Sequence, residues 1–226
     1  MAHRKNIRRR RFALVLAAVA IAAASGGAVA AEDPGLAKAG ACARPIVRTE
    51  QAEGIPRHLL TAISLAESGR YDDASRETIA WPWTINAEGR GMFFETKEAA
   101  VAAVQKLRAR GVASIDVGCM QVNLFHHKDA FANLGEAFDP AANVAYAARF
   151  LKSLREEKRS WSQAVASYHS AERAFGAPYR STVYALWAKV RRAAAKAKQQ
   201  EVIEAYLKRR AAWLAATAAR ASDDPS

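Results

Sequence analysis

Apolar residues recur at helical spacing through most of this chain, and one segment breaks that pattern. The stripe is clearest over residues 140–154, where Asp139 and Pro140 supply an N-cap followed by a proline at the first helical position. Between residues 81 and 94, aromatic and β-branched residues flank a turn that contains a glycine, which predicts a β-hairpin. The sequence therefore predicts a mainly α fold with one small β-hairpin and a long C-terminal helix.

The same periodicity places the individual helices. Glycines, prolines and capping residues set most of their ends. We expect helices over residues 42–53, 56–68, 96–107, 140–154, 161–168 and 178–219, and a short helical piece over residues 123–131.

Residues 1–31 differ from the rest of the chain. Six basic residues and no acidic one lie between Arg4 and Arg11, and thirteen apolar residues follow from Phe12 to Ala24. With a small-x-small pattern at 28–30, these features predict a secretory signal peptide that is cleaved. A membrane anchor is the alternative, but the apolar run is shorter than the ~20 residues of a spanning helix.

The charge of the chain is concentrated at its two ends. The whole sequence carries +12, of which residues 1–31 carry +6 and residues 188–226 carry +5, so residues 32–187 carry +1. A nucleic-acid-binding domain normally carries positive charge on the folded face that binds. The nearly neutral body argues against nucleic acid as a partner, and residues 188–226 form a separate, basic helical tail.

Two cysteines, Cys42 and Cys119, remain after signal cleavage. In an oxidising compartment such a pair suggests a disulfide, worth up to ~4 kcal/mol for a long loop. Two buried free thiols are the alternative. A nucleophilic Cys119 with His126, His127 or His169 as its base lacks any other feature of such a site nearby.

Glu67 is the strongest candidate for a catalytic group. At 100° per residue it lies within about 60° of Leu60 and Ile63, on the apolar stripe of its predicted helix. Buried glutamates are rare unless they are paired or functional, and burial raises their pKa. A protonated Glu near neutral pH is what a general acid for glycosidic cleavage requires. A helix-terminal Glu that binds backbone is the alternative.

Three segments place Glu67 in a family context. A Glu67-Ser68 pair ends an apolar helix, residues 118–123 read Gly-Cys-Met-Gln-Val-Asn, and Tyr168 lies late in the chain. Together they resemble the SLT catalytic domain of lytic transglycosylases, whose signatures are Glu-Ser, Gly-Leu-Met-Gln-[Ile/Val]-Asn and Ala-Tyr-Asn. The resemblance covers roughly residues 52–184.

Other features refine this resemblance. The tryptophan-rich hairpin and residues 139–143 look like a proteobacterial branch of the family. Cys119 stands where the family usually has Leu, and His169 stands where it usually has Asn. No role of that Asn is therefore carried over to His169.

The resemblance implies a lysozyme-like α-helical catalytic domain over residues 32–187. Protonated Glu67 would donate to the oxygen that leaves N-acetylmuramic acid, and the N-acetyl group of that sugar would assist. Glu67 would then accept the proton of the C6 hydroxyl, which closes a 1,6-anhydro ring. Tyr168 would hydrogen-bond Glu67 and orient it. No metal, cofactor or second carboxylate is implied, unlike ordinary glycosidases, which use two carboxylates.

Further residues are candidates for substrate contact, each with a structural alternative. Met120 can equally be core, Tyr168 and Trp83 can be packing residues, and Asn123 can tie the backbone of its motif together. The candidate substrate-binding residues are Ser68, Met120, Gln121, Asn123, Trp83 and His169.

Asp116 and the paired histidines are weaker candidates. Asp116 is the best second carboxylate if the enzyme were a hydrolase, and a turn-stabilising Asp is its alternative. His126 and His127 are adjacent and share no helix face, so no metal site is expected there.

The leading hypothesis is a monomeric, periplasmic lytic transglycosylase that acts on peptidoglycan glycan strands. A lysozyme-type hydrolase and a non-catalytic peptidoglycan-binding or scaffold module are the alternatives, and the intact Glu67 argues against the latter. A secretion system, pilus or flagellum would be a suitable protein partner. The basic tail is either a tether to an anionic surface or a solvated helix.

Overall fold

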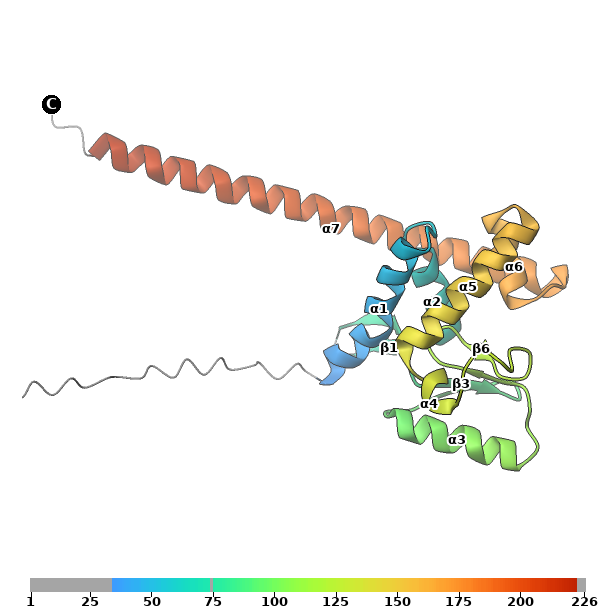
Figure 1. The fold of residues 1–226 in the computed structure, drawn as a ribbon. Helices are drawn as coiled ribbons and strands as arrows, with labels where there is room; N and C mark the ends of the chain where they lie inside the picture. The colour runs from blue at the N-terminus through green and yellow to red at the C-terminus, as the bar shows by residue number, and fades with distance from the viewer. Residues whose placement is uncertain (1–33, 74, 223–226) are drawn as a thin grey trace, which may run out of the picture. The chain divides into compact units, whose positions relative to one another are not determined.

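The computed structural model describes residues 34–73 and 75–222, so the predicted signal peptide lies outside the described residues. Within them the fold is mainly α, with seven helices and six short strands (Figure 1). None of the helices in this part of the chain combines the length and the apolar character needed to cross a membrane.

The helices follow the predicted order closely. Their bounds are α1 Pro34–Ala52, α2 Leu59–Ser68, α3 Lys97–Ala109, α4 Leu134–Ala137, α5 Pro140–Lys158, α6 Trp161–His169 and α7 Arg173–Ser222. Side chains cap four of them as helix-start signals require: Thr96 accepts from the Ala99 amide, Asn133 from Glu136, Asp139 from Ala142 and Ser160 from Gln163.

A buried glutamate from α1 caps α2. His58, the residue before α2, has a left-handed conformation and makes no side-chain cap. Instead Glu50, which is 4% exposed, accepts hydrogen bonds from the amides of His58, Leu60 and Thr61. A carboxylate at this position satisfies free N–H groups and complements the helix dipole. Glu50 thus fixes the start of the helix that ends at Ser68.

The predicted β-hairpin is confirmed, and further strands flank it. Strand β3 (Thr84–Ala87) pairs antiparallel with β4 (Arg90–Phe93), and Glu88 and Gly89 both have positive φ in the turn between them. On its other side β3 pairs with β5 (Ile115–Val117), which pairs with β6 (Val122–Asn123). A separate hairpin consists of β1 (Gly69–Asp72) and β2 (Glu77–Ala80).

Two hydrophobic clusters divide the body of the protein. The first gathers buried residues of α1, α2, α5, α6 and the start of α7, among them Leu60, Ile63 and Val183. The second lies between the sheet and α3 and includes Ile85, Val104 and Ile115. Figure 1 shows the helical group on one side of the strands and α3 on the other.

The predicted helical piece over residues 123–131 is wrong. Asn123 ends β6, and the residues after it form turns and a bend. The Asn123 side-chain oxygen accepts from the amides of Phe125 and His126, and one turn closes where the His127 amide donates to the Asn123 carbonyl oxygen. The next backbone bond, from Ala130 to His127, spans only three residues, so the chain turns away instead of continuing a helix. The short helix α4 begins later, after Asn133, whose side chain accepts from the Glu136 amide.

The C-terminal helix is longer than predicted. α7 begins at Arg173, so Pro178 lies inside its first turns rather than at its start. Its first part packs against α2 and α6, and the Trp187 indole donates to the Arg57 carbonyl oxygen. The predicted boundary at 187/188 falls inside this single helix, and every residue from 195 to 218 is exposed.

A disulfide joins α1 to the segment that precedes β6. Cys42 and Cys119 are both fully buried, and their Cα atoms are 5.9 Å apart. The bond fixes residues 118–123, the segment with the most specific sequence motif, against the helical cluster.

Candidate active site

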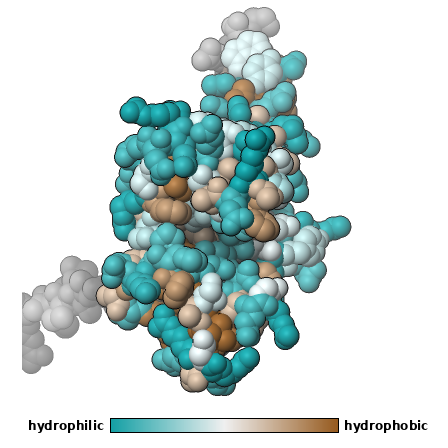
Figure 2. Space-filling view, turned by 90° about the vertical axis from the view of Figure 1, so that its right-hand side faces the viewer, coloured by the Kyte–Doolittle hydropathy of each residue, from teal (hydrophilic) through white to brown (hydrophobic). Residues whose placement is uncertain are grey.

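A cleft of about 850 Å³ lies between the helical cluster and the sheet. Figure 2 looks onto the side where α6 and the start of α7 lie, and it shows a mostly hydrophilic face with a hollow across its middle. Among the lining residues are Glu67, Asn86, Asp116, Gln121, Asn123, Tyr168, His169 and Tyr179. The cleft therefore contains Glu67 and four of the other predicted site residues.

Glu67 lies at the penultimate position of α2, where the helix meets the cleft. Its side chain is only partly exposed, and the Tyr179 hydroxyl donates to its Oε1 at 2.5 Å. Burial raises the pKa of Glu67 to about 8; the Tyr179 hydrogen bond opposes this shift and the nearby charge of Asp116 adds to it. Glu67 is therefore protonated at neutral pH.

Tyr179 is the partner of Glu67 in the cleft that the sequence interpretation missed. It lies in the first part of α7, and burial raises the pKa of its hydroxyl well above the ordinary value. A signal for it exists, because residues 179, 183 and 187 recur at helical spacing and Val183 is fully buried. The helical stripe thus places Tyr179 on the inward face, but sequence does not identify Glu67, 112 positions away, as its partner.

The predicted hydrogen bond from Tyr168 to Glu67 is not present. The Tyr168 hydroxyl instead donates to the carbonyl oxygen of Met120 at 2.8 Å, and its ring packs against Phe150. Tyr168 still lines the cleft, and burial, followed by the charge of Glu67, raises its pKa well above the ordinary value. Tyr168 therefore anchors the motif of residues 118–123, and Tyr179 takes the expected position at the acid.

Gly118 and Asn143 fix the backbone of that motif. Gly118 has a φ of 85°, and a Cβ there would lie 2.4 Å from the Asn143 side-chain nitrogen. That nitrogen donates to the carbonyls of Val117 and Ala137, while the Asn143 oxygen accepts from the Met120 amide. Only glycine fits this close approach at positive φ.

Two predicted substrate-binding residues are structural. Met120 is fully buried in the helical cluster and does not line the cleft. Ser68 is 1% exposed, and its hydroxyl donates to the Cys119 carbonyl oxygen at 2.7 Å, with the Ser64 carbonyl oxygen 3.2 Å away. Ser68 thus links the end of α2, next to Glu67, to the motif instead of contacting substrate.

Gln121 and Asn123 do line the cleft. Gln121 has a φ of 47°, and its side-chain nitrogen donates to the carbonyls of Thr84 and Gly118. The Asn123 nitrogen donates to Asp116 and Ser114. Because its oxygen also accepts from two backbone amides, Asn123 ties the motif together, as the structural alternative proposed.

Asp116 lies in the sheet wall of the cleft rather than in a turn. It stands between Asn86 on β3 and Asn123 on β6, which are its direct partners across the strands. Burial raises the pKa of Asp116, while the Asn123 hydrogen bond and the charges of His169 and His126 oppose that shift. The sheet thus presents one carboxyl and two carboxamides in a row.

His169 is linked to Glu67 through Tyr179. Its ring stacks on Tyr179 with the ring centroids 4.6 Å apart and the planes 9° from parallel. His169 is exposed in the cleft, so it covers the tyrosine that binds Glu67.

Trp83 does not reach the cleft. It packs on the second hydrophobic cluster, edge-on to Trp81, with the ring centroids 6.3 Å apart. Trp83 is therefore a packing residue of the hairpin, as the structural alternative proposed, and it does not lie where the predicted stacking on sugar would occur.

Fold and site together define a mainly α, lysozyme-like protein with a protonated carboxyl in its cleft. A model of the transglycosylase SLT domain family matches residues 44–183, more than half of the chain. This chain belongs to the transglycosylase SLT domain family, which confirms the resemblance found from its motifs. Membership supports peptidoglycan cleavage of the lytic transglycosylase type. No curated protein and no solved structure gave a match.

Proposed function

We propose that this protein is an exported lytic transglycosylase that cleaves the β-1,4 bond between N-acetylmuramic acid and N-acetylglucosamine, with Glu67 as its sole acid/base. The observation that carries the proposal is the position of the Glu67 carboxyl, which lines a cleft of about 850 Å³ and accepts a hydrogen bond from Tyr179. Burial at this position raises the pKa of Glu67 to about 8. A carboxyl with this pKa holds its proton at neutral pH and can donate it to a leaving oxygen.

In the proposed reaction Glu67 acts twice. Its proton passes to the glycosidic oxygen as the bond to the anomeric carbon breaks, and the N-acetyl group of the sugar assists at that carbon. The C6 hydroxyl then attacks the anomeric carbon and gives its proton to the Glu67 carboxylate, which restores the acid and leaves a 1,6-anhydro ring.

Tyr179 supports the charged form of Glu67 between these two steps. Its hydrogen bond favours the carboxylate over the acid, which is why it opposes the effect of burial on the pKa of Glu67. The same bond restrains the carboxyl where the substrate must meet it. Because Tyr179 acts through Glu67, we assign it a positioning role, and His169 stacks on its ring.

We propose that Gln121, on the sheet side of the cleft, recognises a sugar of the substrate. Its side-chain nitrogen is held by two backbone carbonyls, which leaves its oxygen to accept from a sugar hydroxyl or acetamido N–H. Asn123 has a different role, since both ends of its carboxamide bind protein groups, and it holds Asp116 in place.

A lysozyme-type hydrolase is the second candidate, and Asp116 is the observation in its favour. Asp116 lines the same cleft as Glu67, and its charge contributes to the raised pKa of Glu67. A hydrolase would use the second carboxylate to activate water or to bind the anomeric carbon. The two reactions differ in their products, because the anhydro product is lighter by one water.

The test is mass spectrometry of muropeptides released from purified sacculi by residues 32–226. We expect anhydro-muropeptides from the parent and none from Glu67→Gln, which keeps the shape of the side chain and removes its acid. Asp116→Asn is the matched control and should still release anhydro products. Hydrated reducing ends that disappear in Asp116→Asn would establish the hydrolase instead. No release by the folded parent would contradict both reactions.

Export to the periplasm is part of this proposal. Its support is the basic and apolar pattern of residues 1–31 together with the buried Cys42–Cys119 disulfide, because disulfides persist in oxidising compartments. Fractionation of cells that express the full chain should place a shortened protein in the periplasmic fraction. A full-length protein in the cytoplasmic fraction would contradict export.

A further inference from the structure

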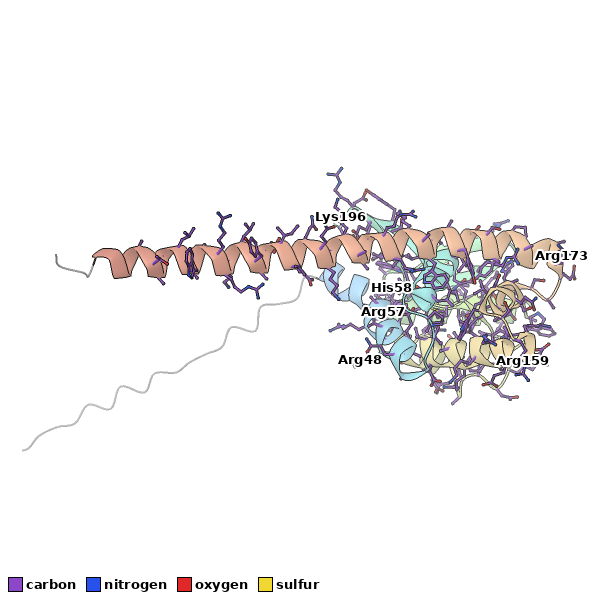
Figure 3. All side chains as sticks on the ribbon, turned by 90° about the horizontal axis from the view of Figure 1, so that it is seen from above. Arg48, Arg57, His58, Arg159, Arg173 and Lys196 are labelled. Atoms are coloured by element: carbon purple, nitrogen blue, oxygen red, sulfur yellow. A yellow bond between two sulfur atoms is a disulfide. The ribbon has the colours of Figure 1, made fainter. Side chains whose placement is uncertain are left out.

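The C-terminal half of α7 exposes an apolar stripe with no partner among the described residues. Its large apolar side chains are each about half exposed or more, from 49% at Ile203 to 64% at Trp213. At 100° per residue they fall within an arc of about 140°. The stripe consists of Val202, Ile203, Tyr206, Leu207, Trp213 and Leu214. Figure 3 shows α7 continuing past Lys196 with no other described helix or strand beside it, and the same end of α7 stands alone in Figure 1.

Basic residues border this stripe along the helix. Residues 188–218 contain eight lysines and arginines and only two acidic residues. On the helical wheel Lys198 and Arg209 lie at one edge of the stripe and Lys196 lies at the other, and all three are exposed. The body before this tail carries a charge of only +1, so the positive charge is a property of the helix itself.

Two features of the stripe distinguish a lipid surface from a second copy of the helix. Arg210 stands in the middle of the apolar arc, where a close-packed coiled coil would bury an unpaired charge at high cost. At a bilayer surface a long arginine side chain can reach the headgroups while its stem stays in the apolar layer. Tyr206 and Trp213 are the residue types that favour the boundary between lipid and water.

We propose that residues 195–218 bind the surface of an anionic phospholipid bilayer, with the apolar stripe buried between headgroups and acyl chains. The adjacent lysines and arginines pair with lipid phosphates. Peptidoglycan carboxylates offer negative charge but no apolar layer, so they account for the basic residues and not for the stripe. The protein would then remain at a membrane while its cleft, whose lining residues end at Tyr179, stays free for glycan strands.

The test is co-sedimentation of residues 32–226 with vesicles. This part of the chain contains both hydrophobic clusters and excludes the apolar run of residues 12–24, which could bind lipid by itself. Vesicles of phosphatidylcholine with roughly a quarter phosphatidylglycerol should bind the protein at least about tenfold more strongly than phosphatidylcholine alone. About 0.5 M NaCl should weaken this binding.

Two triple variants separate the stripe from the rest of the helix. Ile203→Ser, Leu207→Ser and Trp213→Ser together should reduce the partition coefficient at least about tenfold. Ala205→Ser, Ala212→Ser and Ala215→Ser, on the opposite face, add the same number of serines and should leave it within about twofold. Thermal unfolding of the body and release of muropeptides from sacculi should be unchanged in both.

Several outcomes would overturn the proposal. The proposal fails if the parent protein does not bind anionic vesicles. It also fails if the stripe variant binds them as well as the parent does. A dimer of the parent that the stripe variant dissolves, without vesicle binding, would assign the stripe to a second copy of this chain. Salt-sensitive binding to sacculi that ignores the stripe, again without vesicle binding, would assign the basic residues to peptidoglycan.

Discussion

In the proposed reaction Glu67 can donate a proton only while it is protonated, and burial keeps it protonated at neutral pH by raising its pKa to about 8. We therefore expect kcat/KM for glycan cleavage to be flat near neutrality and to fall by about tenfold per pH unit above pH 8. Initial rates on soluble glycan strands from about pH 4 to about 10 test this. A rate that falls already between about pH 4 and 6 would contradict the raised pKa of Glu67.

The same proton makes stability depend on pH. The folded protein keeps the proton of Glu67 up to about pH 8, whereas the unfolded chain loses it near 4.5. The folded state therefore binds more protons in this window, and stability falls as pH rises through it, by up to about 1.4 kcal/mol per pH unit. Glu67→Gln removes this loss, so the variant should gain stability relative to the parent from pH 5 to 8. Urea unfolding at each pH measures the difference, and a constant difference would contradict the raised pKa.

Tyr179 affects Glu67 in a direction that can be measured. Its hydroxyl stabilises the carboxylate, so Tyr179→Phe should raise the pKa of Glu67 further and move the alkaline limb of the activity profile to higher pH. The loss of positioning should also reduce kcat by about tenfold. Tyr168→Phe is the matched control, because that hydroxyl binds Met120, and it should leave the alkaline limb in place. Equal pH profiles in all three proteins would rule out the Tyr179 contact.

Among the elements, α5 holds the motif of residues 118–123 through the side-chain carboxamide of Asn143. Asn143→Ala would leave the carbonyls of Val117 and Ala137 and the amide of Met120 without their partner in a fully buried position. We expect a loss of about 3 kcal/mol in the free energy of unfolding, together with reduced activity. Chemical denaturation measures the first. An unchanged midpoint would mean that another group satisfies these backbone atoms.

Elements with a clear hydrophobic periodicity or turn signal were predictable from sequence. Elements whose conformation depends on a few individual contacts were not. The stripe of α5 and the hairpin β3–β4 follow from periodicity and from a glycine turn, and both are confirmed. Strands β5 and β6 have three and two residues, which is too short to show an alternation. Residues 123–131 do not form a helix although Asn123 caps the first amides, because the single turn closed at His127 is followed by a three-residue turn at Ala130.

The candidate site shows the same division. Glu67 was predictable because helical spacing alone places its carboxyl on the same apolar face as Leu60 and Ile63, where a carboxyl is unusual. The sequence could not predict that Tyr179, and not Tyr168, hydrogen-bonds Glu67. Both tyrosines lie on the inward faces of their helices, and only the packing of the helices decides which hydroxyl meets Glu67. Ser68 and Met120 match the family motif, yet neither lines the cleft: the Ser68 hydroxyl binds the Cys119 carbonyl, and Met120 is fully buried in the helical cluster.

At the scale of the whole molecule, the cleft depends on how two hydrophobic clusters are held together. Glu67, Tyr168 and Tyr179 come from the helical cluster, whereas Asn86 and Asp116 come from the sheet. Residues 118–121 connect β5 to β6, and the fully buried side chain of Cys119 lies in the helical cluster. The disulfide from Cys119 to Cys42 therefore fixes the connection between the two walls of the cleft to α1.

Removal of this disulfide should destabilise the protein without removing its chemistry. The bond closes a loop with a sequence separation of 77, and its loss should lower the free energy of unfolding by about 4 kcal/mol. The double variant Cys42→Ala and Cys119→Ala, compared with the parent in oxidised and reduced form, measures this by denaturant unfolding. Reduced parent and double variant should agree with each other and still cleave glycan at temperatures where they remain folded. If reduction left stability unchanged, the helical cluster alone would hold the connection between the two walls.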